Sequence, residues 1–343
     1  MLSPSLQHRP RAFRSGLPQM LVFAALSLAL GACDSAESPL NPAEDPLAPA
    51  TEPAPAEAVA PDNALALITG QRIAFASTRN GGYDVYKMDP QGNNLAPLAT
   101  SAESESNPAW SYDNKRIALA RLRKDASNVY HYDIWLVDAD GSNGHWARIN
   151  PLSFDLYNAS WSPNGTRLVL NLTLSGAFYV GWLDLATGQV GVFSGGLEDG
   201  LQGQKPSYNS TGQYIVYLGP TGKTINRINA DGSGLKTLVS STNLLSQPAL
   251  SPDGKKLAFV KAVGTYGSNR EIFVKNFADG VTKRLTTSSG NDIQPTWSPD
   301  GSKIAFTSIR SGSYQIWTMS ATGGSVTRIT HTTTGEQDPA WSH

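Results

Sequence analysis

Cysteine is almost absent from this chain of 343 residues, in which Cys33 is the only one. A single cysteine cannot form a disulfide within one chain. Histidine is also scarce, and none of the five has the spacing of a zinc motif such as HExxH. The GxSxG elbow of serine hydrolases is missing as well. Since the sequence offers no catalytic constellation, it predicts a protein that is not an enzyme and that has no metal site and no cofactor.

An excess of positive charge is missing too. The first 33 residues hold three of the 27 Lys and Arg residues and none of the 28 Asp and Glu residues, which leaves 24 basic and 28 acidic residues in the rest of the chain. A mildly acidic protein lacks the electrostatic footprint of non-specific nucleic-acid binding. We therefore expect no nucleic-acid partner.

Three local patterns that could indicate ligand sites have simpler structural explanations. Gly222-Lys223-Thr224 resembles the end of a phosphate-binding loop, but Tyr217 stands where the first glycine of that loop belongs. Asp-Gly pairs recur along the repeats at expected turns, which favours turns over calcium sites. An indole also recurs at one repeat position, where core packing is favoured over a carbohydrate-stacking platform. These indoles are Trp110, Trp161, Trp297 and Trp341.

The N-terminal 33 residues have the pattern of a targeting segment. Arg9, Arg11 and Arg14 precede an apolar stretch from Met20 to Leu30, which is too short for a permanent transmembrane helix. The stretch ends in Leu30-Gly31-Ala32-Cys33, which resembles the bacterial lipobox, whose cysteine carries a diacylglycerol. We therefore expect residues 1–33 to be a lipoprotein signal peptide with Cys33 as the lipidated residue. The alternative is an ordinary signal peptide with a chance cysteine. The pattern is compatible with attachment to the inner or to the outer membrane.

Residues 34–62 are rich in proline and alanine. They contain seven prolines, seven acidic residues and no basic residue. Such a segment has too few apolar side chains to form a core, so it predicts a disordered tether. Its 29 residues could span roughly 90 Å in an extended polyproline-like conformation. The part that follows, residues 63–343, is then a head on a tether.

One short phrase recurs along this head and predicts its fold. PTWSPDGSKIAFT from Pro295 is the clearest copy, and related copies start at Pro108, Ala159, Pro206 and Pro248. The apolar triplets that end the phrases are 44, 51, 47, 42 and 47 residues apart, counting from the first at Ile73. A period of roughly 40 to 50 residues with four short strands per unit is typical of a β-propeller.

The two ends of the chain predict how the propeller closes. RIAF at residues 72–75 has no preceding PAWS phrase, and PAWSH at residues 339–343 has nothing after it. The C-terminal phrase can therefore supply the missing inner strand of the first blade and satisfy its open edge. We expect an all-β fold: a six-bladed propeller of four-stranded blades, closed by the C-terminal strand.

The repeat also resembles a known family. Phe306-Thr307-Ser308, Arg310, Gly312 and Ile316-Trp317, followed by Gly323 and Arg328-Ile329-Thr330, are similar to the WD40-like repeat of the TolB-type propellers of bacterial periplasmic proteins. The resemblance covers nearly all of the chain after residue 66 and implies a six-bladed propeller. Its repeat is shared by interaction proteins, sensors and peptidase gating domains. TolB itself has an α/β domain before its propeller and is not lipid-anchored, so we expect a TolB-like protein rather than TolB.

The connections predicted to vary between blades are candidate binding loops. The second blade has a long one from Arg121 to Tyr132, and the fifth has another from Ala262 to Arg270. A rim that grips a partner and a pair of solvated hairpin ends both fit these loops. The candidate contacts are Arg121, Arg123, Tyr130, His131 and Tyr266.

Acidic residues recur before the repeated phrase in consecutive blades. Three positions before its Pro or Ala stand Glu105, Asp292 and Glu336, and Asp155 lies near the equivalent position of the third blade. This spacing predicts an acidic arc at the channel mouth that favours a cation or the basic end of a partner. The alternative is that these carboxylates bond their own turns.

These patterns predict a lipid-anchored, periplasm-facing module of the bacterial cell envelope that binds a protein or peptide, as a monomer. A ligand-binding or hydrolytic propeller with a cation in its channel is the alternative, and a purely structural envelope component is the third possibility. Fold alone does not decide among them.

Overall fold

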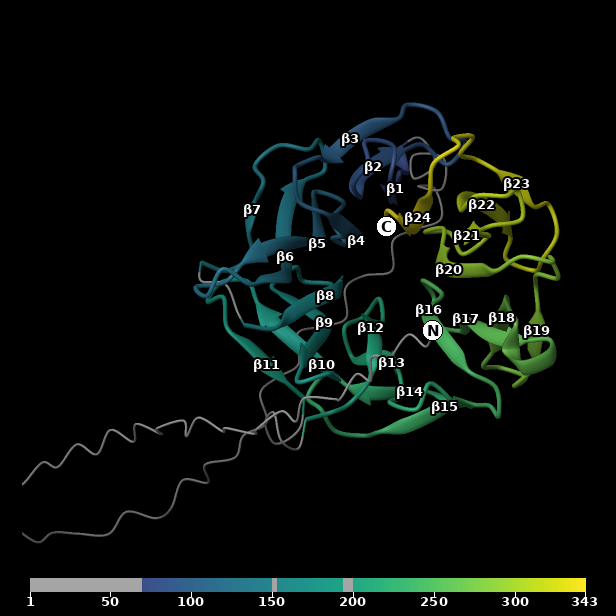
Figure 1. Ribbon diagram of the computed structural model, residues 1–343. Helices are drawn as coiled ribbons and strands as arrows, with labels where there is room; N and C mark the ends of the chain where they lie inside the picture. Colours follow the sequence, from purple (N-terminus) through teal and green to yellow (C-terminus); the bar gives the residue numbers. More distant parts are fainter. Residues whose placement is uncertain (1–69, 150–152, 194–199) are drawn as a thin grey trace, which may run out of the picture. The chain divides into compact units, whose positions relative to one another are not determined.

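A computed structural model describes residues 70–149, 153–193 and 200–343. The predicted signal peptide with Cys33, the predicted tether at residues 34–62 and residues 63–69 lie outside the described residues. The described part forms six antiparallel four-stranded sheets arranged around a central channel (Figure 1). The expected all-β fold with six four-stranded blades is confirmed.

Each blade contributes strands a to d from the channel outward, and the blades follow one another along the chain. The a strands are β24 (Glu336–Trp341), β4 (Glu105–Trp110), β8 (Asp155–Trp161), β12 (Gln204–Tyr208), β16 (Leu245–Leu250) and β20 (Asp292–Trp297). The b strands are β1 (Ile73–Ser77), β5 (Arg116–Lys124), β9 (Arg167–Leu174), β13 (Tyr214–Leu218), β17 (Lys256–Val263) and β21 (Lys303–Ser308). The c strands are β2 (Asp84–Met88), β6 (Tyr130–Asp138), β10 (Ala177–Asp184), β14 (Thr224–Asn229), β18 (Asn269–Asn276) and β22 (Gln315–Ser320). The d strands are β3 (Ala96–Ala99), β7 (His145–Trp146), β11 (Val190–Val192), β15 (Lys236–Ser240), β19 (Thr282–Arg284) and β23 (Thr327–Arg328).

The C-terminal strand closes the ring as the sequence predicts. β24 pairs antiparallel with β1, so that Trp341 lies opposite Ile73 and Glu336 lies opposite Ser77. The first blade is therefore built from both ends of the described chain. The inner edge of β1 is paired by this strand and does not stay open.

The apolar alternation of the b and c strands builds the core between the blades. Ile73 and Phe75 of β1 are fully buried and pack with Ile316 of the sixth blade and with Trp341. The repeated indoles join neighbouring blades: Nε1 of Trp161 donates to the carbonyl of Ala109 over 3.0 Å. Trp297 makes the equivalent bond to Ala249 over 3.0 Å, and Trp110 bonds the carbonyl of Ala340 over 3.1 Å. The preference for a core role of these indoles agrees with this packing.

The Asp-Gly pairs form turns. In the sixth blade Ser298 Oγ donates to Asp300 Oδ1 over 2.6 Å, and Gly301 has a φ of +67°. The amide of Lys303 then donates to Ser298 Oγ over 2.9 Å. The hydroxyl and carboxylate satisfy the turn backbone, and glycine adopts the left-handed conformation at no steric cost.

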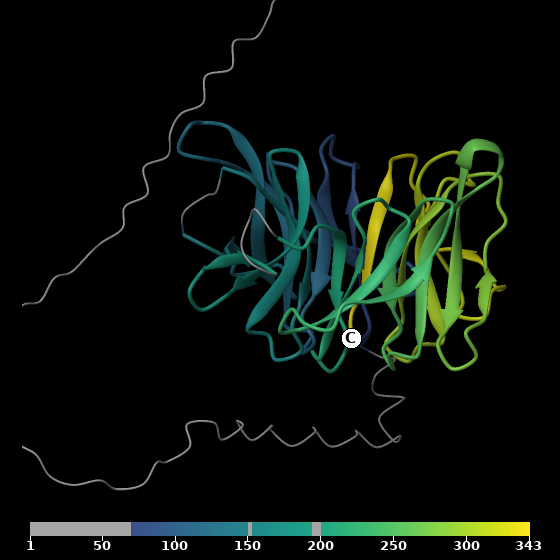
Figure 2. The same ribbon diagram turned by 90° about the horizontal axis from the view of Figure 1, so that it is seen from below.

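The two faces of the propeller differ (Figure 2). The face that carries the a–b and c–d turns is called the turn face, and the opposite one, with the b–c connections, is called the hairpin face. The b–c hairpins that end on the hairpin face differ in length between blades. The strands β5 and β6 have nine residues each and β9, β10, β17 and β18 have eight each, whereas β1, β2 and β13 have five. Among the described residues no helix is long and apolar enough to cross a membrane.

This hairpin geometry corrects the expected loops. The second-blade connection is shorter than predicted, because Arg121 pairs with Asp133 and Arg123 pairs with His131 in the β5–β6 ladder. In the fifth blade the strands likewise extend to Val263 and from Asn269. The extension of the third-blade hairpin was not predicted.

Candidate functional site

The central channel is lined by one polar side chain from each blade. These six residues, which we call the channel ring, stand directly before the Pro or Ala of the repeated phrase and interrupt the a–b ladder with a bulge. They are Asn107, Asn158, Lys205, Gln247, Gln294 and Asp338, with φ values of 51°, 52°, 52°, 50°, 57° and 53°.

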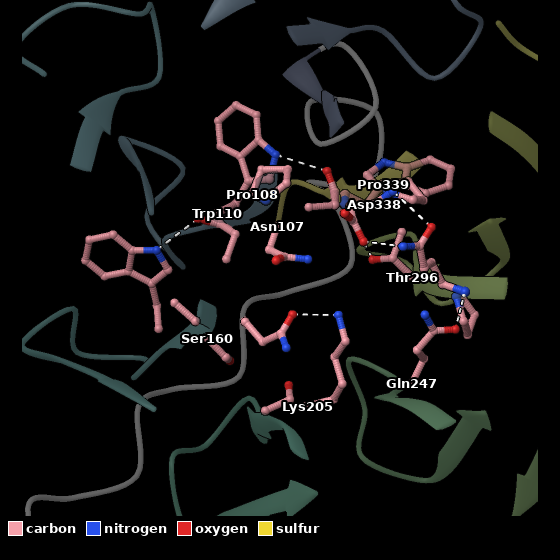
Figure 3. A pocket seen from close by; sticks show the side chains of 18 of the residues that line it. Asn107, Pro108, Trp110, Ser160, Lys205, Gln247, Thr296, Asp338 and Pro339 are labelled. Atoms are coloured by element: carbon pink, nitrogen blue, oxygen red, sulfur yellow. Dashed lines mark hydrogen bonds between the residues drawn. The ribbon is translucent and has the colours of Figure 1, made fainter. Parts of the chain in front are cut away.

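The backbone of the channel ring is strained at every position. A left-handed conformation is uncommon for a residue with a side chain, and five of the six also precede a proline. Each such residue costs on the order of 1–3 kcal/mol, and conformations of this kind gather at functional sites. All six side chains line the channel cavity, and Figure 3 shows Asn107, Lys205, Gln247 and Asp338 around it.

The channel ring encloses a cavity of about 250 Å³. Lys205 Nζ donates to Asn158 Oδ1 over 2.5 Å on one side. On the other side the amide N–H of Gln294 donates to Gln247 Oε1 over 2.9 Å, and the amide N–H of Asp338 donates to Gln294 Oε1 over 3.1 Å. Gln294 Nε2 donates to the Asp338 carboxylate. Neighbouring members of the ring thus hold one another in place.

Two members of the channel ring are charged, and they come from opposite blades of the six. Burial lowers the pKa of Lys205, and the charge of Asp338 works against this shift. Burial also raises the pKa of Asp338, while Lys205, Asn107 and Gln294 favour its ionised form. No described carboxylate lies within 4.0 Å of the Lys205 ammonium. The two charges therefore face the channel without forming an ion pair with each other.

The predicted acidic arc is not an open cluster. Glu105, Asp292 and Glu336 are fully buried, with side chains 0% exposed. Each carboxylate pairs with an arginine of its own blade. The N–O distance is 3.3 Å from Arg121 to Glu105, 2.7 Å from Arg310 to Asp292 and 3.2 Å from Arg79 to Glu336. The predicted acidic arc therefore does not offer free carboxylates to a cation or a basic partner, since each of the three is paired with an arginine below the surface.

The same carboxylates also accept hydroxyl hydrogen bonds from the chain four residues earlier. Ser101 Oγ donates to Glu105 over 2.5 Å, and Thr332 Oγ1 donates to Glu336 over 2.7 Å. Burial raises the pKa of Glu105 to about 6, with a smaller contribution from the Asp84 carboxylate, against the Ser101 hydrogen bond and the Arg121 charge. These contacts join strands and blades, which is a structural use of the acids that counting positions in the sequence did not reveal.

The remaining acid of the predicted arc belongs to a different group. Asp155 is partly exposed and accepts a hydrogen bond from the amide of Tyr132 over 2.9 Å. His131 lies between two carboxylates, with Nε2 3.5 Å from Asp125 and Nδ1 3.7 Å from Asp155. The structure thus brings His131 of the predicted rim together with Asp155, across the boundary of the second and third blades.

The predicted rim residues divide by what they contact. Arg121 lies over the ring of Trp135 at 4.4 Å as well as pairing with Glu105. Arg123 pairs with Asp133 at 3.2 Å and lies over Trp146 at 4.7 Å. Both guanidinium groups are therefore occupied within their blade.

The other two rim residues lie in different blades. Tyr130 is 52% exposed at the start of β6. Tyr266 belongs to a single 3₁₀ turn, Thr265–Gly267, in the fifth-blade hairpin. The predicted rim is therefore not one continuous cluster.

A second cavity opens between the hairpins of the second and third blades. This blade cleft, of about 400 Å³, is lined by Ser106, Asn107, Tyr132, Asp155, Tyr157, Thr173 and Phe178. In the β5–β6 hairpin that contributes Tyr132 to this lining, Val129 and Tyr130 are about half exposed, and Phe178 of the lining is 37% exposed. Asn107 lines both the blade cleft and the channel. In the described part of the chain, no group of three or more His, Cys, Asp or Glu residues could hold a metal ion.

The sequence contained a signal for the channel ring that its analysis missed. The residue directly before the Pro or Ala of the repeated phrase is polar in all six copies. Counting three positions back led to the buried ion pairs, while counting one position back leads to the channel. The bulge decides this difference, because it rotates that side chain out of the alternation of the strand.

Comparisons with known proteins agree with this architecture. Residues 233–343 match the family model described as the TolB beta propeller domain. A "Protein TolB homolog" of Chlorobaculum tepidum is 28% identical over 109 residues, which are 32% of this chain and 23% of that protein. The "Tol-Pal system protein TolB" of Francisella tularensis is 33% identical over 83 residues, which are 24% of this chain and 19% of that protein. The chain thus matches less than a quarter of the length of either relative.

Solved structures show the same fold. TolB from Acinetobacter baumannii has a TM-score of 0.67 at 22% identity, covering 80% of this chain and 67% of that one. An oligogalacturonate lyase in complex with manganese has a TM-score of 0.51 at 16% identity, covering 76% of this chain and 74% of that one. The propeller is TolB-like in fold, and the same fold occurs in an enzyme.

Proposed function

We propose that this protein is a lipid-anchored β-propeller of the bacterial cell envelope that faces the periplasm and binds a protein or peptide on its hairpin face. The observation that carries the proposal is the gathering of exposed aromatic and apolar side chains on adjacent hairpins. Val129 is 51% exposed and Tyr130 52% exposed in the β5–β6 hairpin, which contributes Tyr132 to the blade cleft, and Tyr157 and Phe178 line the same cleft. Exposed aromatic residues that flank a partly apolar hollow are typical of protein interfaces.

The TolB-like fold supports an interaction module of the envelope. The two curated relatives are named as TolB proteins, one of them of the Tol-Pal system. The lipobox-like stretch that ends at Cys33 supports membrane attachment, and the acidic segment after it supports a tether. The proposal is one of binding rather than catalysis, because the channel offers amides and two opposed charges, which suit recognition.

The chain path fits docking on the hairpin face. β1 begins opposite the end of β24, so the chain enters the propeller on the turn face. A tether attached there leaves the hairpin face free for a partner. We propose that the protein acts as a monomer.

Site-specific photo-crosslinking tests the proposal. A photoreactive amino acid replaces Tyr130 in the full-length protein, and the crosslinks formed in intact cells are identified by mass spectrometry. The matched control replaces Val281, which is 59% exposed and lies directly before β19 on the turn face. We expect one defined envelope partner from position 130 and none from position 281. Equal crosslinking at both positions, or none at either, contradicts the proposal.

A further inference from the structure

The channel presents unused hydrogen-bond donors on one side. An ammonium group has three donors, and Lys205 Nζ gives one of them to Asn158. In the neighbouring blade the Gln247 side chain uses its oxygen to accept from Gln294, while its Nε2 donates to no described residue. Lys205 and Gln247 therefore form a donor side of the channel, in the fourth and fifth blades.

The opposite side presents an acceptor. Asp338 belongs to the first blade and receives hydrogen bonds from Gln294 and Asn107. No described Lys, Arg or His nitrogen lies within 4.0 Å of its carboxylate. Its negative charge is thus stabilised by neutral amides but is not balanced by a cation at contact distance.

Two desolvated charges held apart are costly unless something lies between them. Burial acts against the charged form of both Lys205 and Asp338, and each pKa shift reflects that cost. The other four blades show that Asn or Gln suffices to build the channel ring in the same left-handed conformation. Ring geometry therefore does not require either charge.

We propose that the channel binds a small zwitterion, whose carboxylate contacts Lys205 and Gln247 and whose ammonium contacts Asp338. An α-amino acid and a short unblocked peptide share this chemistry. The cavity of about 250 Å³ lies below the range of drug-sized pockets, which suits a ligand of few heavy atoms. A simple anion would leave Asp338 without a partner, and a metal cation would be repelled by Lys205. This site is distinct from the hairpin face and does not depend on partner docking there.

Calorimetry on the full-length protein in detergent tests the proposal with four probes. L-alanine and L-alanyl-L-alanine carry both charges, whereas N-acetyl-L-alanine keeps only the carboxylate and L-alaninamide keeps only the ammonium. We expect at least one zwitterion to bind the channel. Each singly charged analogue should bind the channel roughly ten- to a hundredfold more weakly, which is the effect of losing one charge-assisted hydrogen bond. The comparison of alanine with dialanine distinguishes a free amino acid from a peptide. The proposal is overturned if neither zwitterion binds at millimolar concentration, or if a blocked analogue binds equally well.

Two charge-neutralising variants assign the contacts. Lys205→Gln and Asp338→Asn place residues that the ring already holds at equivalent positions, namely Gln247 and Asn107. Each variant should weaken zwitterion binding roughly ten- to a hundredfold. The matched controls Lys236→Gln and Asp231→Asn change exposed charges near the turn face and should leave the affinity unchanged.

Melting curves of the two variants test whether a loss of binding comes from a loss of the fold. Since each substitution removes a desolvated charge, the melting temperature should hold or rise. A marked fall in melting temperature in both variants would show that the charges serve the fold and would overturn the proposal. Unchanged zwitterion binding in both variants would overturn it as well.

Discussion

At the scale of single residues, one substitution reports on the buried ion pairs. Glu105 is fully buried, and burial raises its pKa from an ordinary 4.5 to about 6. Because the folded pKa is above the unfolded one, its contribution to stability is complete below pH 4.5 and is lost as the pH rises through 6. The loss amounts to about 2 kcal/mol, from 1.36 kcal/mol per pKa unit.

Glu105→Gln should abolish this part of the pH dependence. Urea unfolding between pH 4 and pH 7.5 measures the unfolding free energy of wild type and variant. As the pH rises, the wild-type value should fall by about 2 kcal/mol relative to that of the variant. The matched control is Glu103→Gln, which removes the more exposed carboxylate that also pairs with Arg121. A parallel pH dependence for wild type and Glu105→Gln would show that Glu105 keeps an ordinary pKa in the fold.

The repeated indoles allow a second residue-scale prediction, within a single blade. Trp297 Nε1 bonds the Ala249 carbonyl of the preceding blade, whereas the buried Nε1 of Trp317 has no hydrogen-bond partner among the described residues. Trp297→Phe leaves that carbonyl unpaired and should cost about 1–3 kcal/mol more than Trp317→Phe, which removes an unsatisfied donor. Chemical denaturation of both variants measures the difference. Equal losses would mean that the inter-blade hydrogen bond contributes nothing beyond packing.

At the scale of elements, the sequence predicts strand type and order better than strand length. The PTWSPDG phrase determines the a strand, the turn and the b strand because each part has a local cause: an apolar alternation, an Asp that bonds its backbone and a glycine with positive φ. The long hairpins of the second, third and fifth blades have no such cause. In the second blade the outer pairs carry Arg121, which pairs with Glu105 and lies over Trp135, and Arg123, which pairs with Asp133 and lies over Trp146.

The candidate site was harder to predict for a related reason. A one-residue bulge decides which side chain of the a strand enters the channel. The sequence around Glu105 and Asn107 shows two polar residues, and strand alternation alone does not predict that the first is buried beside Arg121 while the second turns inward. The sequence shows where each polar residue stands in the repeat, but it does not show the left-handed backbone that turns the side chain of the channel-ring residue into the channel.

Ring closure gives the element-scale prediction. Deleting residues 339–343 removes Trp341, which is 5% exposed, and half of the β24 pairing with β1. Loss of the buried indole alone should cost about 3–5 kcal/mol, a large share of a typical stability of about 5–15 kcal/mol. The truncated protein should melt far earlier or aggregate through the open edge of β1, as followed by calorimetry and light scattering. Deleting only His343 leaves β24 whole and serves as the control. A truncated protein with the wild-type melting curve would show that the ring does not need this strand.

At the scale of the whole molecule, the proposed docking surface and the proposed membrane anchor belong to separate parts of the chain. The described chain enters the propeller on the turn face, where β1 begins, and the aromatic side chains around the blade cleft lie on the hairpin face. The channel ring lies between the two faces and takes one side chain from every blade. Lys205 and Asp338 line the channel but not the blade cleft, so a change at either should alter the proposed zwitterion site without removing the proposed docking surface.

The anchor is the last prediction, and it concerns the only cysteine of the chain. If Cys33 is lipidated, it carries at least two acyl chains, which hold a protein on a membrane where a single chain is marginal. Wild-type protein should partition into the detergent phase of a Triton X-114 extraction and stay with membranes after a carbonate wash. Cys33→Ser should move it to the aqueous phase without changing the melting temperature, because the described propeller strands begin only at Ile73. Asp34→Ser, one residue further on, keeps the cysteine and is the matched control. If Cys33→Ser and inhibition of lipoprotein signal peptidase both leave processing and membrane association unchanged, the lipoprotein assignment is wrong, and residues 1–33 act as an ordinary secretion signal.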